Sequence, residues 1–166
     1  IYTVKKGCHH LHSRNLLIDN WPWKLIRKSK MPTKVICFAW TALYEACLSQ
    51  YNLKKRKIQL PSRCYMCKKE AETNRHLFLH SEVTSDIWNM FFFSIFGLKW
   101  TTPLSVKEAY KRWCLWRVDK AIKKIWNMVP ACIFWCLWLE RKRRCFDGES
   151  TPIDLLKASK MYCQFV

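Results

Sequence analysis

The sequence predicts a mainly α-helical protein, in which a short Cys-x2-Cys turn precedes the second long helix and a helical extension follows it. Half of the residues are apolar and ten are tryptophan, so we expect a buried core. Only three residues are glycine, which leaves little room for tight β-hairpins or glycine-rich phosphate loops. Apolar side chains recur at helical spacing through most of the chain, which favours helices over strands.

The first half of the chain contains two predicted helices. Pro32 suits a first helical position, because its missing N–H costs nothing there, and the apolar pattern that follows predicts an amphipathic helix over 33–50. A second helix is predicted from about 71–74, through Trp88, to a point before Gly97. Residues 100–103 read as a linker. We therefore expect a domain over residues 1–100 and a helical extension over 101–166.

The extension carries clear helix boundaries. Ser105 and Glu108 have the spacing of a capping box, which predicts a short helix to about Trp116. A long helix is predicted over 118–146, with a kink or break at Pro130 and an end at Asp147-Gly148. A final helix is predicted from about Thr151 to Cys163.

The charge balance is strongly basic. Thirty Lys and Arg against twelve Asp and Glu give a formal net charge of +18, which favours a polyanionic partner. We expect contacts with the phosphates of RNA or DNA, helped by aromatic side chains that stack on unpaired bases. A single basic run is more often a solvated face, so only the sum of the runs favours binding. The candidate nucleic-acid-binding residues are Arg27, Lys28, Lys54, Lys55, Arg56, Lys57, Arg141, Lys142, Arg143 and Arg144.

The ten cysteines do not read as a disulfide framework. Cys37, Cys47, Cys132 and Cys136 lie in apolar helical patterns, where a free thiol behaves as a small hydrophobe. No signal peptide opens the sequence, so we expect a reducing, intracellular compartment rather than secretion. The longest nearly uncharged stretch, 125–139, is shorter than the roughly 20 residues that cross a bilayer, so we expect no membrane segment.

The clearest chemical motif is Cys64-x2-Cys67 followed by His76 and His80. Two thiolates on a short turn can bind one metal ion, and two histidines four residues apart share one face of a helix. This spacing predicts a tetrahedral zinc site with Cys64, Cys67, His76 and His80 as ligands. The other interpretation is two incidental thiols beside histidines on a polar helix face.

No catalytic constellation is visible in the sequence. Cys64 and His76 could form a nucleophile and base, but the neighbouring Cys67 makes metal binding the better explanation. A two-metal nuclease needs clustered carboxylates, whereas the aspartates are scattered and none is paired with another. We therefore expect no enzymatic activity. The aspartates are Asp19, Asp86, Asp119, Asp147 and Asp154.

Several motifs together resemble a known family. They are the Trp23–Val35 segment with Phe38 and Trp40, the Cys64 and Cys67 pair, the Glu70–Thr73 stretch, the His76–His80 stretch, and Ile87-Trp88. Over about residues 1–95 they resemble the zinc-binding domain near the C-terminus of plant LINE-type retrotransposon reverse transcriptases. The segment over 133–141 resembles the helical region that follows this domain in many plant copies.

The resemblance implies a non-catalytic, zinc-binding accessory domain that contacts nucleic acid. It implies other parts of a retroelement polyprotein as partners, and a nuclear or cytoplasmic location. Cys64, Cys67 and His76 match ligands of the family, but Ser81 replaces its fourth ligand, a cysteine. A hydroxyl is a poorer zinc ligand than a thiolate, so water or His80 would complete the site. The alternative is a degenerate, stand-alone helical structural or protein-interaction module without metal or nucleic-acid function.

Overall fold

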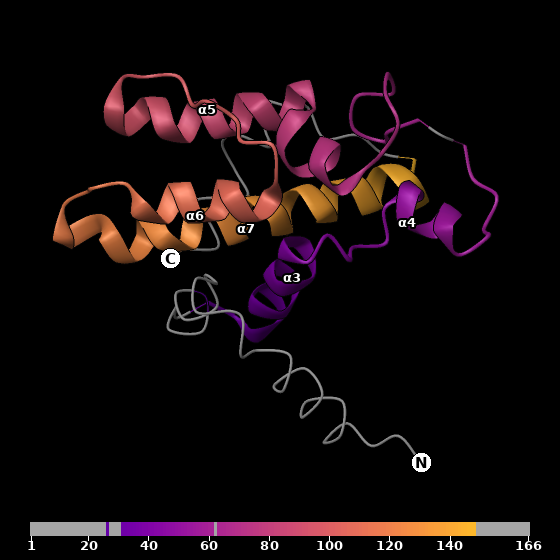
Figure 1. Ribbon diagram of the computed structural model, residues 1–166, viewed down its shortest axis with the longest axis horizontal. Helices are drawn as coiled ribbons and strands as arrows, with labels where there is room; N and C mark the ends of the chain where they lie inside the picture. The colour runs from indigo at the N-terminus through magenta and orange to yellow at the C-terminus, as the bar shows by residue number, and fades with distance from the viewer. Residues whose placement is uncertain (1–25, 27–30, 62, 149–166) are drawn as a thin grey trace, which may run out of the picture.

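The computed structural model describes residues 26, 31–61 and 63–148 (Figure 1). The prediction of a mainly α-helical fold is confirmed: no strand is present in these residues, and one isolated bridge joins Arg63 and Ala71. The helices are α3 (Thr33–Leu43), α4 (Gln50–Lys55), the π-helix η2 (His76–His80), α5 (Glu82–Phe96), α6 (Val106–Leu115) and α7 (Lys120–Phe146).

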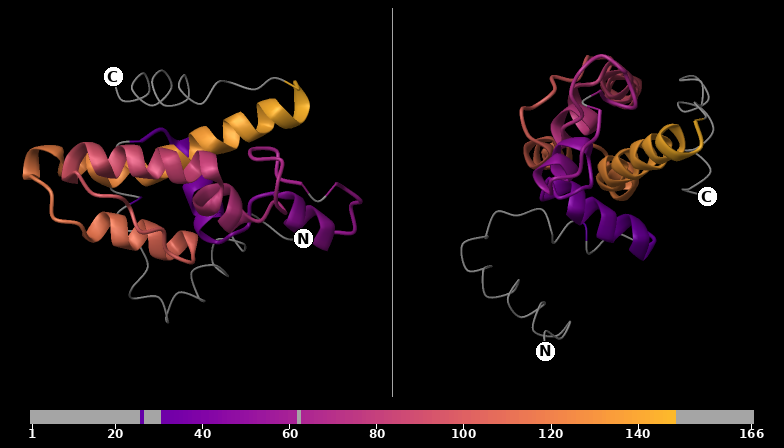
Figure 2. Two further views of the ribbon diagram at one scale, coloured as in Figure 1. Left: turned by 90° about the horizontal axis from the view of Figure 1, so that it is seen from above. Right: turned by 90° about the vertical axis from the view of Figure 1, so that its right-hand side faces the viewer.

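Helix α7 is the longest element and the one on which the others pack. It runs along most of the described part of the molecule, with α5 and α6 extending beside it and α3 crossing it (Figures 1 and 2). Contacts join α7 to α3, to α6 and to η2, and join η2 to α5. Residues 31–100 and 101–148 therefore contribute to a single hydrophobic core.

An aromatic stack joins α6 to α7 at the centre of this core. The rings of Trp113 and Trp126 lie parallel, with centroids 4.0 Å apart and an interplanar angle of 14°. Each indole nitrogen donates a hydrogen bond of 2.9 Å to the backbone carbonyl of the other tryptophan. Large buried side chains with satisfied polar atoms of this kind give a core one preferred arrangement.

Pro130 lies inside α7 without ending it, so of the two predicted outcomes, a kink or a break, the break does not occur. Proline lacks the N–H that would bond to the carbonyl of residue 126. The indole of Trp113 donates to that carbonyl instead. The Tyr110 hydroxyl lies 3.4 Å from the next carbonyl, that of Asn127. The Trp113 side chain of α6 thus supplies the hydrogen bond that the proline removes, and Tyr110 adds a contact one residue further on.

The helix predicted over 33–50 is shorter in the structure and ends at Leu43. Glu45 has a φ of 53°, which a regular helix does not allow. The Asn52 side chain donates to the carbonyls of Glu45 and Cys47, each at 2.8 Å, and Asn74 also donates to Glu45. These amide side chains stabilise a turn where the apolar pattern alone favoured more helix.

The helix predicted from 71–74 to Gly97 is divided at Ser81. The Ser81 N–H donates to the His76 carbonyl at 2.9 Å, a π-helical bond, and the chain is then extended at Ser81 before α5 begins. The predicted end is confirmed, because Gly97 is left-handed with a φ of 66° and its N–H donates to the Phe93 carbonyl.

The predicted boundaries of the later helices are confirmed. The Ser105 hydroxyl accepts a hydrogen bond of 3.2 Å from the Glu108 N–H at the start of α6. Helix α7 ends at Phe146, just before Asp147 and the left-handed Gly148. The helix predicted from Thr151 lies outside the described residues. Among the helices that the structure describes, none is long and apolar enough to cross a membrane.

Candidate metal centre

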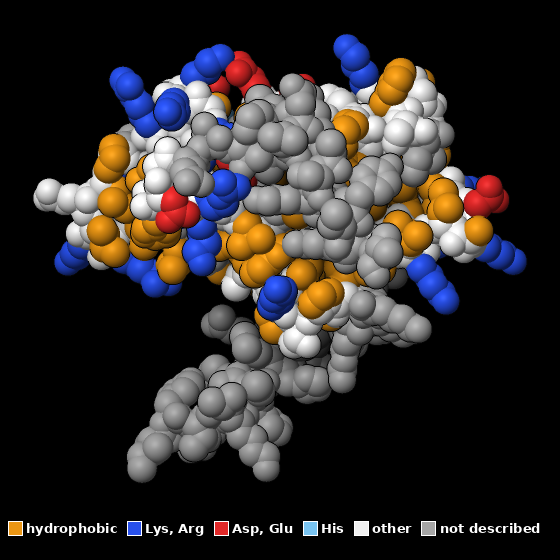
Figure 3. Space-filling model, turned by 180° about the vertical axis from the view of Figure 1, so that it is seen from behind, with side chains coloured by type: hydrophobic (Ala, Val, Ile, Leu, Met, Phe, Trp, Pro, Cys, Tyr) orange, Lys and Arg blue, Asp and Glu red, His pale blue; other side chains and the backbone are white. Residues whose placement is uncertain are grey.

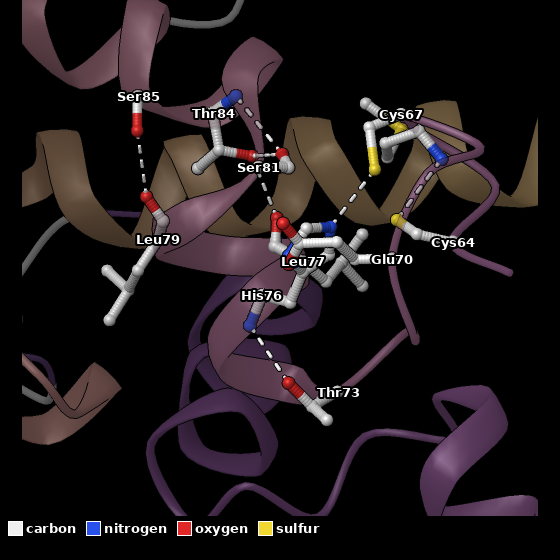
Figure 4. A network of polar contacts seen from close by, with 11 residues as sticks. Cys64, Cys67, Glu70, Thr73, His76, Leu77, Leu79, Ser81, Thr84 and Ser85 are labelled. Carbon is white, nitrogen blue, oxygen red and sulfur yellow. Dashed lines mark hydrogen bonds and ion pairs between the residues drawn. The ribbon is translucent and has the colours of Figure 1, made fainter. Parts of the chain in front are cut away.

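Cys64 and Cys67 lie on a tight turn that the backbone closes on itself. The Cys64 N–H donates to the Glu70 carbonyl at 2.7 Å, and the Lys68 N–H donates to the Cys64 carbonyl at 2.8 Å. Lys68 has a φ of 57°, which lets the chain reverse. The Met66 N–H lies 3.4 Å from the Cys64 sulfur and points its positive end at it (Figure 4). This contact partly offsets the desolvation that disfavours a thiolate at Cys64.

His76 projects from the first residue of η2 toward this turn. Its backbone N–H donates to the Thr73 hydroxyl at 3.1 Å, and its side chain is buried. The Nε2 atom lies 3.1 Å from the Cys67 sulfur, and the Nδ1 atom lies 3.1 Å from Glu70 Oε2 (Figure 4). A histidine that binds a metal through one nitrogen commonly donates the other N–H to a carboxylate, as this pair would.

The geometry of Cys64, Cys67 and His76, which we call the Cys2His cluster, suits a metal ion. Their ligand atoms all lie within 4.8 Å of one another. Bonds near 2.3 Å to sulfur and 2.0 Å to nitrogen place the ligands of a tetrahedral zinc ion about 3.5 to 3.8 Å apart. Burial raises the pKa of the Cys64 thiol to about 11, because the thiolate is desolvated there. A bound cation would offset this cost.

The structure brings three of the four predicted ligands together and leaves His80 apart. His80 is exposed at the end of η2 and does not belong to the Cys2His cluster. Ser81 is buried, and its hydroxyl is 2.7 Å from the Thr84 hydroxyl and accepts from the Thr84 N–H at 3.3 Å (Figure 4). Ser81 thus serves as the N-cap of α5.

A buried ion pair, which the sequence did not indicate, supports the turn that carries Cys64 and Cys67, which we call the metal-binding turn. Glu72 Oε1 accepts from Arg141 Nη2 at 2.9 Å and from the Gln50 N–H at 3.0 Å, while Oε2 accepts from the Tyr65 N–H at 3.2 Å. Arg144 donates to the Met66 carbonyl at 2.8 Å. Two arginines of α7 therefore hold the turn from outside. Only the folded chain shows this, because 69 residues separate Glu72 from Arg141.

The predicted basic residues fall into two groups: those that are exposed at the surface, and those that form ion pairs with glutamates. Lys54, Lys55, Arg56 and Lys57 are all exposed at the end of α4, and Lys55 Nζ lies 4.5 Å from the centre of the Tyr51 ring. On the face shown in Figure 3, Lys and Arg side chains project at several places and outnumber the acidic ones. Arg27 and Lys28 lie outside the described residues.

The basic run over 141–144 does not form a continuous cationic face. Arg141 is buried against Glu72, so the prediction that it contacts phosphate needs correction. Arg143 and Arg144 form ion pairs with the buried Glu140, and only Lys142 of this run is exposed. Burial of an arginine is stable only with a partner, and here the partners lie on the metal-binding turn and within α7.

The described fold and the Cys2His cluster define a small helical protein with a candidate metal centre formed by a turn and a helix. The family model described as zinc-binding in reverse transcriptase matches residues 2–88, just over half of the chain. The chain belongs to this family. No curated protein and no solved structure gave a match.

Proposed function

We propose that the chain binds one zinc ion through Cys64, Cys67 and His76, and that the ion has a structural role. The convergence of these three side chains carries the proposal. Water, or His80 after a side-chain rotation, would supply the fourth ligand. The two nearby carboxylates, Glu70 and Glu72, already contact His76 and Arg141, which supports a structural rather than a catalytic ion.

The zinc proposal is tested by metal analysis and by thermal unfolding before and after chelation. We expect one zinc per chain, and a lower melting temperature once the metal is removed. Cys64→Ser should lose the zinc. Cys37→Ser should keep it, because Cys37 is exposed on α3 and lies outside the cluster. A chain that holds no zinc, with unfolding indifferent to the chelator, would contradict the proposal.

We further propose that the chain is a non-catalytic accessory domain of retroelement origin that binds RNA or DNA through phosphate contacts. The formal charge of +18 and the four exposed cations at the end of α4 support this role. A plant LINE-type source, polyprotein partners and a nuclear or cytoplasmic location are parts of the same proposal. They rest on the motifs of the first 95 residues.

The nucleic-acid role is tested by the salt dependence of binding to a labelled single strand. The double variant Lys55→Gln, Arg56→Gln should lower the slope of log K against log salt by about 1.4, at roughly 0.7 per phosphate contact on a single strand. The control Lys120→Gln, Lys124→Gln removes the same charge from exposed positions at the start of α7 and should change the slope less. Wild-type protein that binds no nucleic acid would favour the helical interaction module instead.

A further inference from the structure

A pocket of about 760 Å³ opens where α5 and α6 end. These two helix ends lie at the left of Figure 1, away from the metal-binding turn. Every residue that lines it follows residue 88, the last residue that the family model matches. Its wall combines aromatic rings with cations, and we call it the aromatic-basic pocket. The lining residues that matter for binding are Phe92, Phe96, Lys99, Arg112, Trp116 and Arg117.

Trp116 offers the most accessible aromatic surface in this wall. It is 39% exposed, and its ring centroid lies 4.8 Å from that of Phe92 and 4.9 Å from that of Phe96. The Lys123 ammonium donates to the Trp116 carbonyl at 2.7 Å and to the Cys114 carbonyl at 2.9 Å. These contacts hold Trp116 in position while part of the residue stays open to solvent. A ligand that stacks on it therefore costs little further side-chain entropy.

The loop that closes the pocket is also held in place. Gly97 turns the chain at the end of α5, and the Trp100 N–H then donates to the Asn89 side chain at 2.8 Å. The Trp100 indole nitrogen is buried and has no hydrogen-bond partner among the described residues. An unsatisfied buried donor is uncommon.

Three cations surround the aromatic wall. Lys99, Arg112 and Arg117 line the pocket, and none of the described lining residues is acidic. Arg112 contacts Glu108 at 2.5 Å, but both side chains are largely exposed, so water screens the pair and it holds the arginine weakly. An apolar peptide would make no favourable contact with these cations. An anionic ligand with a flat ring can contact both the cations and the aromatic wall.

We propose that the aromatic-basic pocket binds an unpaired base of single-stranded nucleic acid. The base stacks on Trp116, and Lys99, Arg112 and Arg117 contact the flanking phosphates. The inference rests on the proposed nucleic-acid role and adds a stacking site in a region that the family match does not cover. A duplex, whose bases are already stacked and paired, binds this pocket less well than a single strand.

The test measures binding of a fluorescent single-stranded RNA, and of the same strand with 2-aminopurine at one position. Trp116→Ala should weaken binding roughly 5- to 100-fold and abolish the quenching of 2-aminopurine, with no change in the salt slope. Trp116→Phe should restore much of both signals. Phe93→Ala should change neither, because Phe93 is 59% exposed on α5 and does not line the pocket.

A second variant tests the proposal independently if Trp116→Ala does not fold. Arg117→Gln changes an exposed side chain, and should weaken binding and lower the salt slope by about 0.7. If neither pocket variant changes binding while Lys55→Gln, Arg56→Gln does, the pocket proposal is wrong and the nucleic-acid role stands. A wild-type chain that binds no strand overturns both. Binding of an acidic apolar peptide in place of RNA also overturns the pocket proposal.

Discussion

Ser81 lies where η2 meets α5, a position at which a side chain can either cap the helix or bind the metal. The hydroxyl caps α5 by accepting from the Thr84 N–H and contacts the Thr84 hydroxyl. A cysteine at this position would cap the helix poorly but would offer zinc a thiolate. Serine at position 81 therefore provides a helix cap, whereas cysteine would provide a potential zinc ligand.

Ser81→Cys is expected to act in opposite directions on metal affinity and metal-free stability. Zinc affinity should rise on the order of tenfold or more, because a thiolate joins the ligands. The free energy of unfolding of the metal-free chain should fall by about 1 kcal/mol, because the cap is lost. Competition with a chromophoric chelator and urea unfolding measure the two effects. Ser81→Ala, the control, should lose the cap without any gain in affinity.

The Glu72–Arg141 ion pair is the most consequential buried contact of the metal-binding turn. Both side chains are almost fully buried, and Glu72 also accepts from backbone N–H groups at Gln50 and Tyr65. Removing the guanidinium leaves a buried carboxylate without its counter-charge, which costs several kcal/mol. Removing both charges costs less.

Arg141→Met should lower the free energy of unfolding by about 3 to 5 kcal/mol, as measured in urea. The double variant Glu72→Gln, Arg141→Met should recover part of this loss. Arg112→Met removes an arginine from the exposed pair with Glu108 and should cost no more than about 1 kcal/mol. Equal losses for Arg141→Met and Arg112→Met would show that the buried pair has no special role.

At the scale of elements, α6 and α7 depend on each other through the Trp113–Trp126 stack. Pro130 leaves the Trp126 carbonyl without its helical donor, and the Trp113 indole takes that place at 2.9 Å. The Trp113 carbonyl, in the last turn of α6, receives the Trp126 indole in return. The Trp113 indole thus replaces a donor that α7 lacks, while the Trp126 indole adds a second donor to a carbonyl that also accepts from the Trp116 N–H at 3.3 Å.

A double-mutant cycle between Trp113 and Pro130 tests this dependence. Trp113→Phe should cost about 2 to 3 kcal/mol in the native background, because it leaves a buried carbonyl unpaired. In the Pro130→Ala background a backbone N–H can bond to that carbonyl, so the same change should cost about 1 kcal/mol less. Chemical unfolding of the four proteins gives the coupling energy. Additive effects would mean that the indole bond does not substitute for the N–H that Pro130 lacks.

At the scale of the whole molecule, α7 completes the core of the segment that holds the metal-binding turn. Ile133, Phe134 and Leu137 are buried, and Phe134 contacts Phe78 of η2 at 5.4 Å between ring centroids. Arg141 and Arg144 reach the turn itself. Without α7, the apolar faces of α3 and η2 would be exposed to water.

Truncation after residue 100 should therefore yield a chain without a cooperative unfolding transition. Its zinc affinity should be lower than that of the full chain, because the turn loses two arginine contacts. Circular dichroism on heating and zinc competition check the two expectations. A fragment that unfolds cooperatively and holds zinc as tightly as the full chain would instead support residues 1–100 as an autonomous domain.

The sequence by itself determined features that depend on neighbouring residues. Ser105 caps α6 and Gly97 ends α5, because the hydrogen bonds and dihedral angles involved belong to one turn of chain. The Cys64-x2-Cys67 spacing and His76 likewise predicted three side chains that the structure gathers. The helical class followed from apolar periodicity, which is also a local property.

Tertiary structure decided everything that depends on a partner distant in sequence. Arg141 is buried because Glu72 lies opposite it, and α7 continues through Pro130 because Trp113 supplies a donor. The aromatic-basic pocket exists only because the ends of α5 and α6 meet. Sequence patterns carry the preferences of each segment, but the free energy of a buried charge, carbonyl or ring is set by the atoms that folding places around it.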